Sequence, residues 1–179
     1  MIARNWWPVA AWLGVIRLES TSYASAANTF RLLYRVVNSV FGRVDPQFVF
    51  ELDHVLRKSG HFVGYAILSG LTFLALRNTH RDRVRSTMRR PWGSYLGDWW
   101  QMEWSLIAML LTVVTASLDE IHQTFLPSRT GRWQDVVLDT SGAFALQLVI
   151  YLLCQLRFSL RNSGGVPPAP KLPLAESDS

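Results

Sequence analysis

The sequence is poor in cysteine, the residue that stabilises many small domains through disulfide bonds or metal sites. It has one cysteine, Cys154, so it can form no disulfide within the chain and offers no set of thiols for a metal. Its only lysines are Lys58 and Lys171, so the net charge of +5 comes almost entirely from arginine. It also lacks a basic face with interleaved aromatic residues, which makes nucleic acid a poor candidate partner.

What the sequence does contain is apolar residues gathered into blocks. Hydrophobic residues make up 49% of the chain, yet the mean hydropathy is only +0.13, because an arginine-rich loop and a polar tail lower the average. The blocks cover about residues 6–16, 59–76, 104–118 and 140–156. The last two approach the length of a membrane span once the turns beside them are added. We therefore predict an all-α membrane protein with four transmembrane helices in one domain, residues 1–160, followed by a disordered tail, residues 161–179.

The N-terminal third leaves alternatives open. Ala24-Ser25-Ala26 has the form of a signal-peptide cleavage site, but paired tryptophans and Pro8 suit a signal peptide poorly, so a retained first helix is favoured. Residues 24–42 follow a helical period, with apolar side chains on one face and arginines on another. This amphipathic helix, between the first and second spans, is expected to lie along the membrane surface. A helix that caps the bundle fits the pattern equally well.

The next helix is expected to start at Asp45-Pro46, with an N-cap and a first-turn proline, and to continue into the span 59–76. An arginine-rich loop follows that span directly. It contains Arg77, Arg81, Arg83, Arg85, Arg89 and Arg90. By the positive-inside rule this loop, both termini and the tail are cytoplasmic, and residues 121–134 lie outside.

Ionisable residues gather in residues 117–142, between the last two spans. Charges at membrane depth are costly and therefore suggest a functional site. The candidate catalytic residues are Asp119, Glu120, His122, Asp135 and Asp139. The candidate substrate-binding residues are Lys58, His61, Tyr65, Gln123 and Arg129. The predicted orientation places seven of these residues at the extracytoplasmic ends of their helices: Lys58, His61, Asp119, His122, Arg129, Asp135 and Asp139. We expect His61, Asp119, His122, Asp135 and Asp139 to face a shared pocket, with Arg129 over its mouth.

Three chemistries compete for this cluster. A metal site could use His61 and His122, but no HExxH motif or comparable spacing is present, so no metal is predicted. Acid–base catalysis on a lipid-linked substrate would use the acids beside a phosphate clamp formed by Lys58, Arg129 and Arg132. The same charges could instead form an ion-pair network that locks three helices together. Binding of a lipid-like ligand without chemistry is a further reading.

The catalytic hypothesis depends most on two residues, Arg129 and Asp139. Arg129 follows the helix break expected at Pro127, where its guanidinium could hold a phosphate through two parallel hydrogen bonds. Asp139, at the start of the last span, could take a proton from water or from a substrate hydroxyl. The sequence leaves the cofactor, the oligomeric state and the existence of a reaction open.

Three blocks carry a family resemblance: residues 58–65 (KSGHFVGY), 119–129 (DEIHQTFLPSR) and 135–142 (DVVLDTSG). In order and spacing they resemble the VanZ-like membrane proteins, over about residues 50–156. The resemblance implies a small multi-pass protein of the bacterial cytoplasmic membrane with a role in the cell envelope. It also implies a link to glycopeptide (teicoplanin) susceptibility, and a membrane lipid or lipid-linked envelope intermediate as the partner.

Overall fold

The computed structural model describes residues 2–21, 25–87, 100–126 and 131–163. These ranges form helices and no strands, which confirms the predicted all-α fold. The helices are α1 (Ile2–Glu19), α2 (Ala26–Phe41), α3 (Pro46–Thr87), α4 (Met102–Thr124) and α5 (Trp133–Ser163). The predicted tail lies mostly outside the described residues.

Three helical segments in the described ranges are long and apolar enough to cross a membrane: Pro46–Val84, Met102–Thr124 and Trp133–Leu160. Each exceeds the roughly 20 residues that a bilayer core requires. The chain therefore has the make-up of a multi-pass membrane protein. Helix α1 has 18 residues, carries Arg4, Arg17 and Glu19, and is not one of the three. A fourth span and cytoplasmic termini stay predictions.

The local sequence sets where α2 ends and α3 begins. Gly42 ends α2 with a φ of 80°, a backbone conformation that residues with a Cβ rarely adopt. The Asp45 carboxylate then accepts a hydrogen bond of 2.9 Å from the main-chain N–H of Gln47, which caps the first turn of α3. Helix α3 continues for 42 residues, so the predicted helix from Asp45-Pro46 into the second span is confirmed.

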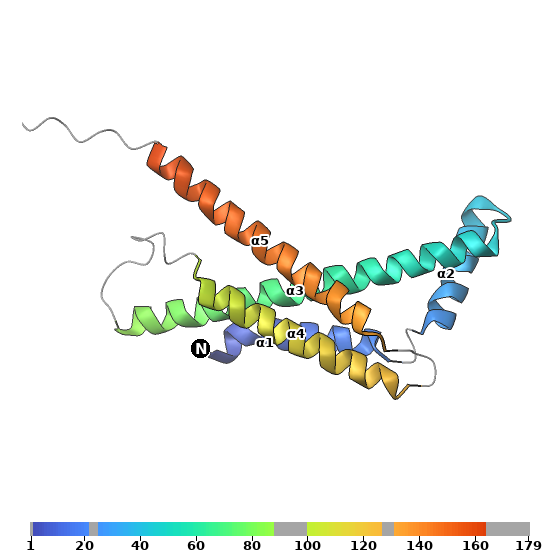
Figure 1. The fold of residues 1–179 in the computed structure, drawn as a ribbon, viewed down its shortest axis with the longest axis horizontal. Coiled ribbons are helices and arrows are strands. Elements are labelled where there is room, and N and C mark those ends of the chain that lie inside the picture. The colour runs from blue at the N-terminus through green and yellow to red at the C-terminus, as the bar shows by residue number, and fades with distance from the viewer. Residues whose placement is uncertain (1, 22–24, 88–99, 127–130, 164–179) are drawn as a thin grey trace, which may run out of the picture.

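The long helix α3 is the element against which the others pack (Figure 1). Helix α1 lies mainly along the C-terminal half of α3. Trp6 Nε1 donates to Thr79 Oγ1 at 3.2 Å, and Trp12 Nε1 donates to the Gly64 carbonyl, near the middle of α3, at 2.8 Å. Helix α4 follows the same half, and α5 crosses α3 obliquely. As a result, the C-terminal ends of α1 and α4 and the start of α5 converge near the middle of α3.

The crossing of α5 over α3 is a backbone-to-backbone contact. A Cβ at Gly142 would overlap the main-chain carbonyl of Phe62, so only glycine permits this approach. Further along both helices, Gln147 Nε2 donates to Ser69 Oγ at 2.9 Å. Both contacts fix the register of α5 on α3.

Helix α2 and the first half of α3 form a hairpin that extends beyond the rest of the bundle (Figure 1). Thr29 Oγ1 donates to Asp53 Oδ2 at 3.3 Å and joins the two helices. Much of the apolar surface of the hairpin is uncovered: Leu32 is 65% exposed and Val40 is 67% exposed. The two sequence-based readings of α2, a membrane-surface helix or a cap on the bundle, both stay predictions.

Candidate functional site

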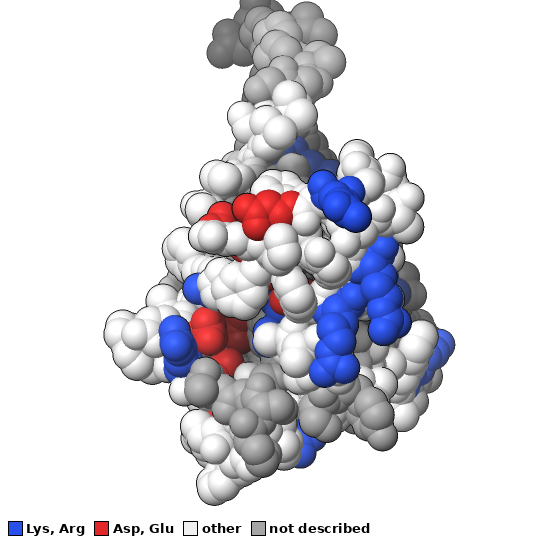
Figure 2. Space-filling view, turned by 90° about the vertical axis from the view of Figure 1, so that its right-hand side faces the viewer, with Lys and Arg blue, Asp and Glu red and all other residues white. Residues whose placement is uncertain are grey.

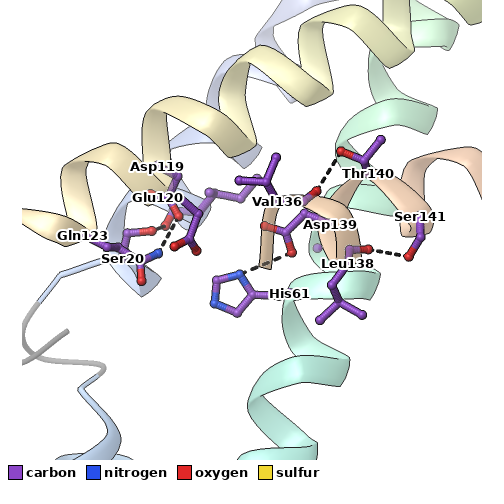
Figure 3. A network of polar contacts seen from close by, with 12 residues as sticks. Ser20, His61, Asp119, Glu120, Gln123, Val136, Leu138, Asp139, Thr140 and Ser141 are labelled. Carbon is purple, nitrogen blue, oxygen red and sulfur yellow. Dashed lines mark hydrogen bonds and ion pairs between the residues drawn. The ribbon is translucent and has the colours of Figure 1, made fainter. Parts of the chain in front are cut away.

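The polar residues of the predicted site lie where the end of α4 and the start of α5 meet α3. Figure 3 shows His61 of α3 between the acids of α4 and Asp139 of α5. Figure 2 views the molecule from the side on which the α2 hairpin projects, and basic and acidic side chains are interspersed with uncharged ones on this face. Three helices thus deliver ionisable groups to one level of the structure.

The half-buried His61 of α3 faces the fully buried Asp139 of α5. Nδ1 of His61 lies 3.6 Å from Oδ1 of Asp139. Asp139 is 0% exposed, and neither of its carboxylate oxygens has a hydrogen-bond partner among the described residues. The approach permitted by Gly142, three residues further along α5, brings Asp139 against His61. Because Asp139 faces Nδ1, Nε2 is the ring nitrogen left for another partner.

The end of α4 supplies a second group of buried polar side chains: Asp119, Glu120 and Gln123. Gln123 Nε2 donates to Asp119 Oδ2 at 2.9 Å, between residues one helical turn apart. The main-chain N–H of Arg132, just before α5, donates to Glu120 Oε2 of α4 at 2.8 Å and ties the two helix ends together. Neutral donors therefore hold both carboxylates in place.

A cavity of about 440 Å³ opens beside these residues. Its charged lining consists of Arg57, Lys58, Glu120, Arg132 and Asp135. The rest of the lining is Ala26, His54, His61, Gln123, Gln134 and Leu138. In the part of the chain that the structure describes, no ion pair joins the side chain of Lys58 or Arg132 to an acid. Among the described residues these two cations therefore form no ion pair of the predicted network, whose third cation, Arg129, lies outside the described residues.

The structure separates the predicted site residues into groups. Those that line the cavity are Lys58, His61, Glu120, Gln123 and Asp135. Those that are buried and do not line it are Tyr65, Asp119 and Asp139. His122 is half-buried and does not line the cavity either. Arg129 and Pro127 lie outside the described residues, so the expected position of Arg129 over the mouth stays a prediction.

Tyr65 was predicted to bind substrate, but its side chain lies in the apolar core. It is 1% exposed, it packs in the apolar core with Val9, Leu68 and Ala116, and its ring stacks on that of His61. Its hydroxyl has no hydrogen-bond partner in the described ranges. The ring of Tyr65 therefore packs against the ring of His61, and Tyr65 is not part of the cavity lining.

Three polar residues of the cavity were not predicted: His54, Arg57 and Gln134. A signal for the first two was present, since His54, Arg57 and His61 are spaced at i, i+3 and i+7 and so share one face of α3. That face continues the one used to predict Lys58, His61 and Tyr65. Gln134 lies next to Asp135 in the first turn of α5, and no pattern in the sequence distinguishes it.

The arrangement defines what the site can do chemically. Within the described ranges no cluster of three or more His, Cys, Asp or Glu could hold a metal ion. Three cations can bind an anionic group, two cavity-wall carboxylates can accept hydrogen bonds, and His61 can accept or donate a proton at Nε2.

The fold and site together define a class: a helical, multi-pass membrane protein with a polar cavity at one end of its bundle. A sequence profile of the VanZ/LLP1 family matches residues 6–155. The chain therefore belongs to the VanZ/LLP1 family, as the three sequence blocks indicated. The match begins within α1 and includes the α2 hairpin. No curated protein and no solved structure matched the chain.

Proposed function

We propose that this protein binds the anionic headgroup of an envelope lipid or lipid-linked intermediate in the cavity between α3, α4 and α5. The observation that carries the proposal is the set of cations in the cavity wall, of which Lys58 and Arg132 make no ion pair within the described ranges. Phosphate is the preferred anion, because guanidinium and ammonium groups form strong charge-assisted hydrogen bonds to it.

The acids in the cavity wall narrow the class of headgroup further. Glu120 and Asp135 stand in the same lining as the cations and would repel a bare phosphate. Ionised carboxylates only accept hydrogen bonds, so they favour a ligand that also carries hydroxyl groups. In a phosphate joined to glycerol or to a sugar, the phosphate can bind the cations and the hydroxyl groups can donate to the carboxylates. Lipid and glycolipid headgroups have this composition.

A second candidate function is hydrolysis or transfer at the same headgroup. It is favoured by the His61–Asp139 pair, in which a fully buried acid faces one nitrogen of an imidazole that itself lines the cavity. In this arrangement Nε2 of His61 would take the proton from water or from a substrate hydroxyl, and Asp139 would orient the ring. Asp139 thereby becomes a positioning residue, while Glu120 and Asp135 are the acids within reach of the ligand. Arg129 keeps its predicted role in holding phosphate.

The binding proposal is tested by removing one cavity cation at a time. We expect Lys58→Gln and Arg132→Gln each to weaken binding of sn-glycerol 3-phosphate about tenfold, the loss of one charge-assisted hydrogen bond. The control is Arg35→Gln, since Arg35 is exposed on α2 and does not line the cavity. Isothermal titration calorimetry on the purified protein measures the affinities. The proposal fails if wild type does not bind, or if the control loses as much affinity as the cavity variants.

The catalytic candidate has a separate test. Wild type is incubated with a bacterial lipid extract, and products are followed by mass spectrometry. We expect Asp139→Asn to abolish turnover while glycerol 3-phosphate still binds. Binding without any turnover by wild type would reject the catalytic candidate and leave the binding proposal standing.

The proposal also places the cavity on the extracytoplasmic side, because the arginine-rich loop is expected inside. In a Cys154→Ser background, an impermeant maleimide added to intact cells should label Thr130→Cys and spare Arg83→Cys. The opposite pattern would reverse the orientation. The link to teicoplanin susceptibility stays a prediction, which a comparison of strains with and without the protein would test.

A further inference from the structure

A second cavity, of about 420 Å³, lies between α2 and the first half of α3. Its apolar walls come from Leu32, Leu33, Val36 and Leu56. Its other lining residues are Glu19, Thr29, Asp53, Arg57, Gly60 and His61. We refer to it as the α2–α3 groove. Leu32 is 65% exposed and Leu56 is 51% exposed, so the groove presents apolar side chains that no described segment covers.

The α2–α3 groove adjoins the polar cavity. Arg57 and His61 line both spaces, so the same two side chains stand between a charged chamber and an apolar one. A ligand that entered only the polar cavity would leave the apolar wall uncovered. An amphiphile could use both, with its charged end among the cations and its apolar end along α2.

We propose that the α2–α3 groove receives one hydrocarbon chain of the amphiphile whose anionic headgroup occupies the polar cavity. This inference rests on the proposed headgroup function and adds the class of the ligand, a phosphate-bearing lipid bound by head and chain together. The support is that Arg57 and His61 belong to the linings of both adjoining spaces, and that one lining is rich in charged side chains while the other has apolar walls. Burial of the chain against Leu32, Val36 and Leu56 would supply the hydrophobic part of the affinity.

The floor of the groove contains a position suited to blocking it. Gly60 lines the groove but not the polar cavity, and a Cβ built there meets no atom within 4 Å. A larger side chain can therefore enter the groove without displacing the helices. Gly14 provides a matched control, because it is also an exposed helical glycine with open space at its Cβ, and it lines neither cavity.

The experiment compares Gly60→Phe, Gly14→Phe and wild type in amphipol, with two probes. The probes are sn-glycerol 3-phosphate, which is a headgroup alone, and 1-oleoyl lysophosphatidate, which adds one chain. We expect wild type to bind the lysolipid about a hundredfold more tightly than the headgroup, since burial of only about four methylene groups gives such a factor. Gly60→Phe should lose most of this advantage with unchanged affinity for glycerol 3-phosphate, and Gly14→Phe should behave as wild type.

The results distinguish this inference from the proposal on which it rests. If glycerol 3-phosphate binds but the lysolipid binds no better, or if Gly60→Phe leaves lysolipid affinity unchanged, the groove is not a chain site and the headgroup proposal survives. If glycerol 3-phosphate does not bind to wild type, the headgroup proposal itself fails. Light scattering on the same samples tests whether a second copy of the chain occupies the groove. A wild-type dimer that Gly60→Phe converts to a monomer would show that it does, and would overturn the inference.

Discussion

Helix α3 meets α5 and α2 in two different ways. At the α5 crossing the backbones touch at Gly142, Asp139 is 0% exposed, and Gln147 is hydrogen-bonded to Ser69. At the α2 contact Thr29 is hydrogen-bonded to Asp53, but Leu32 keeps 65% of its surface exposed. The same helix therefore has one tightly packed crossing and one open one.

The difference indicates that α3 is rigidly packed where it meets α5 and loosely packed where it meets α2. Close backbone packing allows little relative movement, so the α5 crossing fixes Asp139 against His61. The α2 contact has few buried apolar side chains, and segments of that kind open at low free-energy cost. The proposed lipid site would use both properties: a fixed polar end at the α5 crossing and an exposed apolar wall at the α2 contact.

The largest effect should come from leaving the buried acid at the α5 crossing without its partner. We expect His61→Ala to lower the free energy of unfolding by about 3 kcal/mol, because the fully buried Asp139 carboxylate then loses the imidazole that faces it. Asp139→Asn should cost less, and the double variant His61→Ala/Asp139→Asn should recover most of the loss. Thermal unfolding in detergent measures all three.

The control for this series is His54→Ala, an exposed histidine on the same helix. It should change stability by less than about 0.5 kcal/mol. A double variant as unstable as the sum of the single variants would show that the two side chains are not coupled, and the α5 crossing would then not depend on this pair.

An intermediate effect is expected from the glycine at the same crossing. Gly142→Ala places a Cβ against the Phe62 carbonyl, and we expect a loss of about 2 kcal/mol, the usual range for overpacking. Gly64→Ala is the matched control, since Gly64 is also a buried helical glycine but a Cβ there meets nothing within 4 Å. Alanine suits a helix better than glycine, so the control should be neutral or slightly stabilising. Equal melting temperatures for the two variants would contradict the contact.

The smallest effect concerns the α2 contact. Thr29→Val removes the hydrogen bond to Asp53 and should cost about 1 kcal/mol. Hydrogen exchange resolves where the loss falls: amides of α2 should exchange faster, while those of α5 stay protected. Faster exchange in α5 as well would show that the two contacts are one cooperative unit, which would remove the contrast drawn above.

The local sequence was sufficient to predict much of the fold. Gly42 ends α2 and Asp45-Pro46 starts α3 because the conformation of glycine and the capping of a free N–H depend on neighbouring residues alone. The membrane-spanning segments of α3, α4 and α5 follow from the length and apolar content of each block. The apolar block 140–156 gave only the span, and α5 extends it in the N-terminal direction to Trp133 through a first turn that carries Asp135.

The candidate site was predicted in part. Spacing at i, i+3 and i+7 placed Lys58, His61 and Tyr65 on one face of α3, but it does not say how deep each residue lies. Tyr65 is in the core and Lys58 is in the cavity wall, since the apolar core that α1 and α4 form with α3 includes Tyr65 but does not extend to Lys58. The same limit applied to the acids, where Asp135 lines the cavity and Asp139, one turn later, is buried.

The sequence by itself determined the helices, their caps, their apolar content and the set of ionisable residues, because these depend on chemistry within a few residues of each position. Only the tertiary structure decided which of those residues meet. The close approach at Gly142 turns Asp139 toward His61, and the extension of α3 beyond the bundle leaves Arg57 and His61 between a polar and an apolar cavity. Such contacts depend on the crossing of segments far apart in the chain, and no local pattern encodes the distance between them.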